Sequence, residues 1–260
     1  MRWRPRSSGV SPAAGAAMID LSGKRLLVTR AAEDAPEWAR EIARAGGRPV
    51  ILPCVVVERL TDRDTAAALR GALRGAAWLA LASRRGAEAA ADLVGGELPP
   101  SVKIAAVGPS TAAAARRRFG RCDLVPPEAT GRGLAIALRQ ALSASREKAP
   151  VVVAAADRGR REIEEILAPE GVEVRRVAVY RSRPAPPASP RRRLGRDELD
   201  AVLLASPSAV RGLLNQAEVD ARLPLVTIGP TTSEAVRHAG LRVAAEARRP
   251  GIHGLLEVVP

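Results

Sequence analysis

Short apolar runs alternate with segments of helical periodicity along almost the whole chain. The runs have the length of strands and are rich in Val, Leu, Ile and Ala. The predicted strands are residues 25–30, 48–58, 77–83, 103–108, 122–126, 150–156, 172–181, 199–206, 224–229 and 241–247. The predicted helices are residues 33–47, 61–73, 84–93, 109–118, 131–142, 158–171, 207–216, 230–240 and 251–259. This alternation indicates βαβ units, and therefore an α/β fold of parallel sheets flanked by helices.

The pattern also repeats itself within the chain. A strand, a Gly-Pro pair, two hydroxyl residues and a helix occur at Gly108 and again at Gly229, 121 positions later (229 − 108). Ser83 corresponds in the same way to Ser206, 123 positions later (206 − 83). We therefore predict two similar lobes that arose by duplication.

Hydroxyl side chains gather at the strand-to-helix turns of both halves. In open α/β sheets, ligands bind beyond the carboxyl ends of the strands, and helix N-termini bind carboxylates or phosphates. A single such turn is explained as well by simple helix capping. Four turns at corresponding places favour a shared anion-binding cleft. The residues in question are Ser83, Ser110, Thr111, Ser206, Ser208, Thr231 and Thr232.

Two further positions carry candidate chemistry. Arg158, beside Asp157 at the turn after the strand at residues 150–156, could hold a carboxylate, or Asp157 could merely cap a helix. Tyr180 is the single tyrosine of the chain and ends a predicted strand. Its ring could simply be packed there, or its phenol could donate a hydrogen bond or a proton to a leaving group.

The charge and composition of the chain limit the classes of molecule that it is expected to bind. The net charge of +13 is carried almost wholly by arginine, which indicates either a solvated basic surface or an anionic partner. Nucleic acid is disfavoured because only 2% of the residues are aromatic, and they form no stacking motif. No apolar run is long enough to span a membrane.

Other motifs are absent from the sequence. There is no phosphate-binding glycine motif and no metal-spaced cluster of His, Cys and Asp. Cys54 and Cys122 form no motif, so we expect buried free thiols in a reducing cytoplasm. The basic, Pro- and Ala-rich residues 1–21 are predicted to be a disordered extension, and translation from Met18 or a transit peptide are the alternatives.

One ordered set of motifs extends from Lys24 to Val259. The motifs are LLVTR, WLALASRRGAEA, IAAVGPSTA, ADRGR, VAVYRSRP, LLASPSAV, TIGPTTSEA and GIHGLLEVV. In this set the chain resembles the uroporphyrinogen-III synthase family. No single motif decides this resemblance, but the ordered set covers nearly the whole chain.

The resemblance implies two flavodoxin-like lobes between which the chain crosses twice. Lobe 1 would comprise residues 22–53 and 184–260, and lobe 2 residues 57–178. Two extended linkers, at residues 52–58 and 177–183, would join them.

The resemblance also implies an activity. Such an enzyme, a cyclising hydro-lyase without cofactor or metal, closes hydroxymethylbilane with inversion of the last pyrrole ring and loss of water. It serves the biosynthesis of haem, sirohaem, cobalamin or chlorophyll. Tyr180 matches the tyrosine thought to assist departure of the hydroxyl group. The seven hydroxyl residues named above match positions that bind the substrate's carboxylates.

The expected partner is thus a linear tetrapyrrole polycarboxylate, with neither nucleic acid nor a membrane. A cytoplasmic monomer is expected, to which hydroxymethylbilane synthase could hand over its product. The chain departs from the family pattern at Ala82, Ala155, Ala156 and Ala205, where polar residues or glycine are usual. A non-catalytic, two-lobed binding or regulatory paralogue is therefore the alternative.

Overall fold

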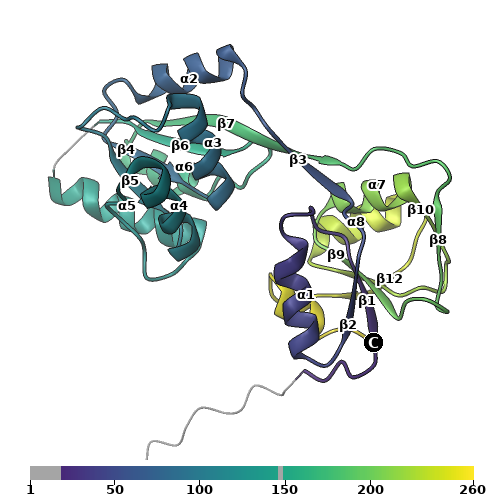
Figure 1. The fold of residues 1–260 in the computed structure, drawn as a ribbon. Helices are drawn as coiled ribbons and strands as arrows, with labels where there is room; N and C mark the ends of the chain where they lie inside the picture. Colours follow the sequence, from purple (N-terminus) through teal and green to yellow (C-terminus); the bar gives the residue numbers. More distant parts are fainter. Residues whose placement is uncertain (1–18, 146–148) are drawn as a thin grey trace, which may run out of the picture. The chain divides into compact units, whose positions relative to one another are not determined.

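The computed structural model describes residues 19–145 and 149–260 (Figure 1). The chain forms two compact units. The first unit contains the chain up to Cys54 together with Pro184–Pro260, and the second unit is Val55–Arg183. A disordered extension was expected for residues 1–21, and residues 1–18 of it lie outside the described residues. At its end the prediction is wrong, because Leu21 is buried and donates its backbone N–H to Ala45 O at 2.7 Å.

The second unit is built on a five-stranded sheet of order β3-β7-β6-β4-β5. The pairs β7-β6, β6-β4 and β4-β5 are parallel. Its strands are β3 (Val55–Arg59), β4 (Trp78–Leu81), β5 (Lys103–Ala106), β6 (Val151–Ala156) and β7 (Val174–Pro184). Its helices are α2 (Arg63–Leu73), α3 (Arg84–Val94), α4 (Pro109–Phe119), α5 (Gly131–Ser145), α6 (Glu162–Leu167) and the 3-10 helix η1 (Ala168–Glu170).

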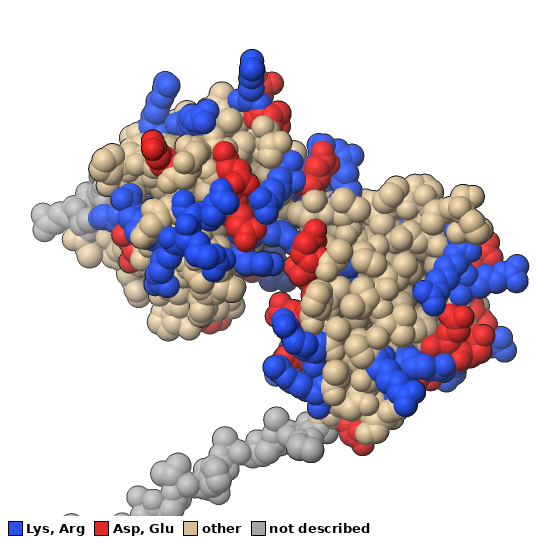
Figure 2. All heavy atoms as spheres, in the orientation of Figure 1, with Lys and Arg blue, Asp and Glu red and all other residues tan. Residues whose placement is uncertain are grey.

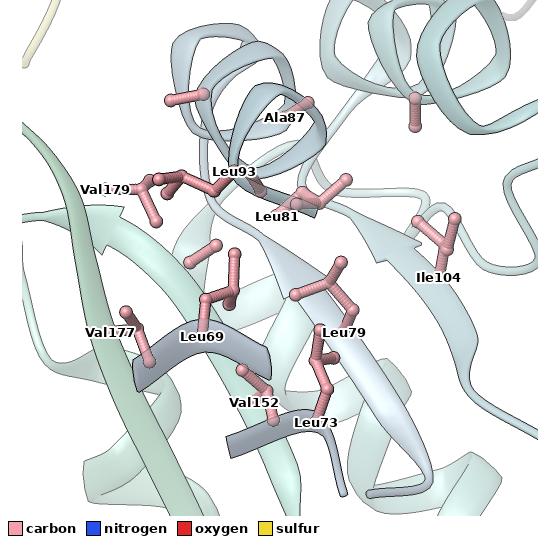
Figure 3. Close-up of a cluster of buried hydrophobic side chains, with 14 of the residues drawn as sticks. Leu69, Leu73, Leu79, Leu81, Ala87, Leu93, Ile104, Val152, Val177 and Val179 are labelled. Atoms are coloured by element: carbon pink, nitrogen blue, oxygen red, sulfur yellow. The ribbon is translucent and has the colours of Figure 1, made fainter. Parts of the chain in front are cut away.

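Helices cover both faces of this sheet because the side chains of its interior strand β4 alternate. Leu79 and Leu81 of β4 point into a cluster with α2, α3 and α4, which Figure 3 shows. Trp78 and Ala80 point into the opposite cluster, formed with α5 and α6. A central strand that is apolar on both sides is typical of a parallel sheet buried between two helical layers.

The first unit has a sheet of order β12-β11-β9-β1-β2, in which all neighbours are parallel. Its strands are β1 (Arg25–Val28), β2 (Arg48–Ile51), β9 (Ala201–Leu204), β11 (Leu225–Thr227) and β12 (Val243–Glu246). Its helices are α1 (Ala35–Arg44), α7 (Pro207–Gln216), α8 (Pro230–His238) and α9 (Ile252–Leu256). Trp38 and Ile42 of α1 and Leu255 of α9 pack on one face of this sheet, while α7 and α8 pack against β9 and β11. The sequence prediction of an α/β fold with parallel, helix-flanked sheets is confirmed.

Some predicted elements differ from the observed ones. The predicted strand at residues 122–126 forms only an isolated bridge from Leu124 to Ala105. The Pro- and Arg-rich segment after β7, expected to be a linker, contains β8 (Arg192–Leu194), which pairs in parallel with β10 (Ala217–Val219). Tyr180 does not end its strand, because β7 continues to Pro184. The segments expected to be linkers, 52–58 and 177–183, overlap β3 and β7 of the second unit.

Candidate functional site

A cavity of about 380 Å³ lies at the carboxyl edge of the second unit's sheet. Residues that follow or end β4, β5 and β6 line it, together with residues of β7 and the starts of α5 and α6. Its wall is formed by Ala82, Val107, Ala129, Thr130, Gly131, Val153, Ala155, Ala156, Gly159, Arg160, Glu162, Ile163, Arg176 and Tyr180. The cavity therefore opens where ligands of doubly wound proteins bind.

Two hydroxyl groups meet beside this cavity. Ser83 Oγ lies 3.0 Å from Tyr180 Oη, although the residues are far apart in sequence. Ser83 also caps α3, since its Oγ accepts the backbone N–H of Gly86 at 3.0 Å. Ser83 had been predicted as a substrate ligand, and Tyr180 as the catalytic residue. The structure brings these two side chains together.

A register shift lies directly at the tyrosine. Ala155 of β6 pairs with Ala178, but Ala156 pairs with Tyr180, so the strands slip by one residue between them. The Tyr180 side chain packs partly against the cluster that contains Val177 and Val179, and it also lines the cavity together with Arg176. A bulge at such a place changes the local direction of the strand and its side chains.

The strand that carries Tyr180 is also held from its other side. Arg181 donates two hydrogen bonds to the Glu58 carboxylate of β3, at 2.7 and 2.6 Å. These hydrogen bonds, aided by the charges of Arg181 and Arg183, keep the pKa of Glu58 below its usual range. Leu60 N–H bonds to Val179 O at 3.0 Å on the same strand. The backbone on both sides of Tyr180 is therefore fixed.

Two arginines bring positive charge to the cavity wall. Arg176 Nη1 lies 2.6 Å from Glu164 Oε1, and its Nη2 donates to Arg160 O at 3.3 Å. Arg160 Nη1 lies 3.6 Å from Glu162 Oε1. Arg158, the arginine selected from the sequence, is exposed and outside the wall, where its N–H bonds to Asp157 Oδ1.

The two Gly-Pro turns expose only part of their hydroxyl groups. In each turn the glycine is the N-cap and the proline is the first helical residue. Ser110 and Thr231 are exposed, but Thr111 and Thr232 are 2% and 3% exposed. The prediction that all four hydroxyls face a ligand is wrong for Thr111 and Thr232, because these two side chains pack inside their units.

In the first unit, Ser206 caps α7 by accepting the N–H of Ala209 at 3.1 Å. Ser208 follows in the first turn, and both serines are half-buried. Thr227 Oγ1 lies 2.6 Å from Ser233 Oγ, whose hydroxyl bonds in turn to Glu246. This chain of polar groups, in which Thr227 and Ser233 are buried, ties the start of α8 to β11 and β12.

Much of the positive charge is paired at the surface. Figure 2 shows Lys and Arg interleaved with Asp and Glu on the visible face of the second unit. In this unit Arg59 bridges Glu88 at 3.0 Å and Asp92 at 2.7 Å, and Arg118 also pairs with Asp92. These arginines fit the solvated-surface interpretation of the net charge.

The sequence reasoning did not select Arg160, Arg176 or Thr130. Arg160 belongs to the ADRGR motif already singled out, two positions after the arginine chosen. Arg176 stands in β7 four positions before Tyr180, but Arg175, Arg181 and Arg183 lie in the same strand, so residue type alone does not single it out. Thr130 caps α5 with a bond from Gly133 N–H at 2.9 Å, and its Thr-Gly-x-Gly context signals a helix start.

The described residues offer neither a cluster of metal ligands nor a membrane-spanning helix. In residues 19–145 and 149–260, no three His, Cys, Asp or Glu side chains lie together as metal ligands would. Within the same ranges, no helix combines the length and the apolar character needed to cross a bilayer.

The fold and the cavity define the class: an α/β protein of parallel, helix-flanked sheets, with a cavity at the carboxyl ends of the strands. The sequence model of the family described as "Uroporphyrinogen-III synthase HemD" matches residues 36–257. The chain therefore belongs to the uroporphyrinogen-III synthase family, an enzyme family of porphyrin biosynthesis.

Individual relatives agree with this assignment. The uroporphyrinogen-III synthase of Synechococcus elongatus is 28% identical over 91% of this chain and 94% of its own length. The porphyrin biosynthesis protein HemD of Ruminiclostridium josui is 25% identical over 87% of this chain, which spans about half (46%) of that protein. The solved uroporphyrinogen-III synthetase of Helicobacter pylori 26695 shares the fold, with a TM-score of 0.52 at 14% identity, over 90% of this chain and 97% of its own.

Proposed function

We propose that this chain cyclises hydroxymethylbilane to uroporphyrinogen III, with inversion of the last pyrrole ring and release of water. Since the chain belongs to this family, one observation supports the proposal most directly. Tyr180, the single tyrosine of the chain, lines the cavity at the carboxyl edge of the second unit's sheet. A volume of about 380 Å³ suits one substituted pyrrole ring rather than a whole tetrapyrrole.

In this mechanism Tyr180 acts as a general acid. Its phenol gives a proton to the hydroxymethyl oxygen, the C–O bond breaks, and water leaves. The electron pair of the adjacent pyrrole nitrogen stabilises the resulting azafulvene cation. The substituted α-carbon of the last ring attacks the exocyclic carbon of this cation and gives the spiro intermediate. The bond from that α-carbon to the methylene of the neighbouring ring then breaks. This methylene forms a new bond with the free α-carbon of the last ring, which leaves the ring inverted. The proton released when the pyrrole regains its aromaticity returns to Tyr180.

Charged and polar groups would hold the flexible substrate during these steps. Arg176, positioned by Glu164, and Arg160 would bind acetate or propionate groups at the cavity, because guanidinium groups pair well with carboxylates. Arg158, Ser110 and Thr231, which are exposed, and the half-buried Ser206 and Ser208 would bind further carboxylates. Holding one conformation is itself a large part of the catalysis, because spontaneous closure gives the other isomer.

Three of the departures from the family pattern fall on the cavity wall. Ala82, Ala155 and Ala156 all line it, so the wall near Tyr180 is more apolar than the family pattern implies. An apolar wall excludes water from a cationic intermediate, which favours cyclisation over hydrolysis. The same departures are the reason to test for a non-catalytic paralogue.

The finer features of the fold and the partners remain part of this proposal. The two units would be flavodoxin-like lobes, with residues 52–58 and 177–183 as linkers. The crossings of the chain between the units after Cys54 and after Arg183 support this assignment. A cytoplasmic monomer that receives its substrate from hydroxymethylbilane synthase, and binds no nucleic acid, likewise stays a prediction.

The test is a coupled assay in which hydroxymethylbilane is generated in place and the uroporphyrin isomers are separated. With the protein we expect predominantly type III product. For Tyr180→Phe we expect kcat to fall about 100-fold with KM little changed, the effect typical of a lost general acid. Type I product alone, at the spontaneous rate, would overturn the proposal in favour of a binding paralogue.

A further inference from the structure

The hydrogen-bonding capacity of Ser83 is already largely used by the protein. A serine hydroxyl has one donor and two acceptor positions. One acceptor position receives the N–H of Gly86, because Ser83 is the N-cap of α3. The second neighbour of its Oγ is Tyr180 Oη, at 3.0 Å. Little capacity is left for a direct bond to a substrate carboxylate.

The distance between the two hydroxyl oxygens fits either donor, but the proposed acid role of Tyr180 requires one direction of this hydrogen bond. Tyr180 can give its proton to the substrate only if it is not donating that proton to Ser83. In that arrangement Ser83 donates its proton to the phenol oxygen, and Ser83 Oγ accepts a hydrogen bond from Gly86 N–H. A hydrogen bond to an oxygen that becomes charged strengthens as the charge develops. The start of the 11-residue helix α3 adds a favourable positive potential at the same place.

We propose that Ser83 is a positioning residue for Tyr180, rather than a ligand of the substrate. It holds the phenol beside the cavity and stabilises the phenolate that forms when the proton leaves with the hydroxyl group. The inference rests on the proposed function of Tyr180.

The first test compares kinetics in the coupled assay. Ser83→Ala should lower kcat for type III product about tenfold or more, with KM changed less than about twofold, as expected for a lost hydrogen bond to a charged group. Ser83→Thr keeps the hydroxyl group and should restore kcat to within about threefold. Ser83→Ala should have no further effect in a Tyr180→Phe background.

The matched control is Asp62→Ala, which removes the N-cap of α2 in the same unit. It should cost similar helix stability but leave kcat unchanged. If Asp62→Ala lowered kcat as much as Ser83→Ala does, the role of Ser83 would be only structural. If Ser83→Ala raised KM and left kcat intact, Ser83 would be a substrate ligand after all. Either result overturns the inference.

A second readout does not depend on activity. Since the chain has one tyrosine, tyrosine labelled with ¹³C at Cζ gives a single NMR resonance. This resonance should move in Ser83→Ala, return in Ser83→Thr and stay in place in Asp62→Ala. An unmoved resonance in Ser83→Ala would refute the pairing. A moved resonance together with an unaffected rate in Tyr180→Phe would instead refute the proposed role of Tyr180.

Discussion

In both units a serine follows a fully buried strand and caps the next helix. Ser83 follows β4 and receives the N–H of Gly86, and Ser206 follows β9 and receives the N–H of Ala209. Ser83 also has a second hydroxyl beside it, that of Tyr180, the single tyrosine of the chain. The duplicated turn thus serves capping in both units, and the added phenol distinguishes one of them chemically.

The neighbouring strands explain the difference. The two sheets share the parallel order β2-β1-β9-β11 in the first unit and β7-β6-β4-β5 in the second. Strand β2 ends at Ile51, and the chain continues from it through the buried Cys54. Strand β7 is longer, with 11 residues, and its register against β6 shifts at Tyr180. A longer strand with a bulge therefore distinguishes the second unit's site from the corresponding edge of the first unit.

The largest expected effect comes from removing buried side chains of the two corresponding strands, β4 and β9. Leu81 and Leu204 end β4 and β9, two positions before Ser83 and Ser206, and both side chains are fully buried. Leu81→Ala and Leu204→Ala should therefore each lower the free energy of unfolding by about 2–5 kcal/mol. Hydrogen exchange, read separately in each unit, measures the loss. The control is Ile51→Ala, since Ile51 is 46% exposed and should lose less. If only one of the two leucine substitutions lowered the free energy of unfolding by less than about 1 kcal/mol, the two sheets would not be equivalent.

A second test exchanges the residues that donate to the two serines. Gly86→Ala should cost about 1–3 kcal/mol, because a Cβ there would lie 2.9 Å from Ala154 O and 3.2 Å from Ser83 Oγ. The reverse change at the corresponding position, Ala209→Gly, should cost only about 0.5–1 kcal/mol through helix propensity. Urea denaturation measures both.

Gly71→Ala is the control for this pair. Gly71 lies within α2 and has open space around its Cβ position, so the change should stabilise the protein slightly. If Gly86→Ala were neutral, the close packing between α3 and β6 would not constrain Ser83.

The third test compares the cysteines of the two units. Burial raises the pKa of the Cys54 thiol to about 12, and burial also raises that of the half-buried Cys122. The unfolded thiol titrates near pH ~8.5, so the unfolded state gains thiolate first as the pH rises. The contribution of the Cys54 thiol to the free energy of unfolding is complete below that pH and is lost as the pH rises toward 12. Between pH 8.5 and 9.5 the protein should lose about 1 kcal/mol of stability through this thiol.

Urea titrations at these two pH values, repeated with Cys54→Ala, measure the loss. In the folded protein at pH 8, iodoacetamide should modify Cys122 before Cys54, because the thiolate is the reactive form. Equal modification rates would mean that Cys54 is more accessible than its burial implies.

Most of the fold could be predicted from the sequence, but not every element. The apolar runs around Leu79 and Val152 gave the parallel strands correctly, since local composition decides strand formation there. The short pair β8 and β10 was missed because three-residue strands have no periodicity to detect. Tyr180 was taken for a strand end because Pro184 lies just beyond it, but proline is compatible with the last position of a strand.

The candidate site was predictable only in part. Hydroxyl-rich turns at strand ends stand out in a sequence because capping is a local interaction. The burial of Thr111 and Thr232 was not visible, since each depends on how its helix packs. Arg176 and Glu164 were missed because their pairing joins a strand to a helix 12 positions away.

The sequence by itself determined the alternation of strands and helices, the internal repeat, the capping serines and the family. All of these rest on local periodicity, or on residue types read in order along the chain. The tertiary structure alone decided that Ser83 meets Tyr180 and that Arg176 lines the same cavity. These contacts depend on strand order and on a one-residue slip between β6 and β7, and both are set by packing between distant segments rather than by any local preference.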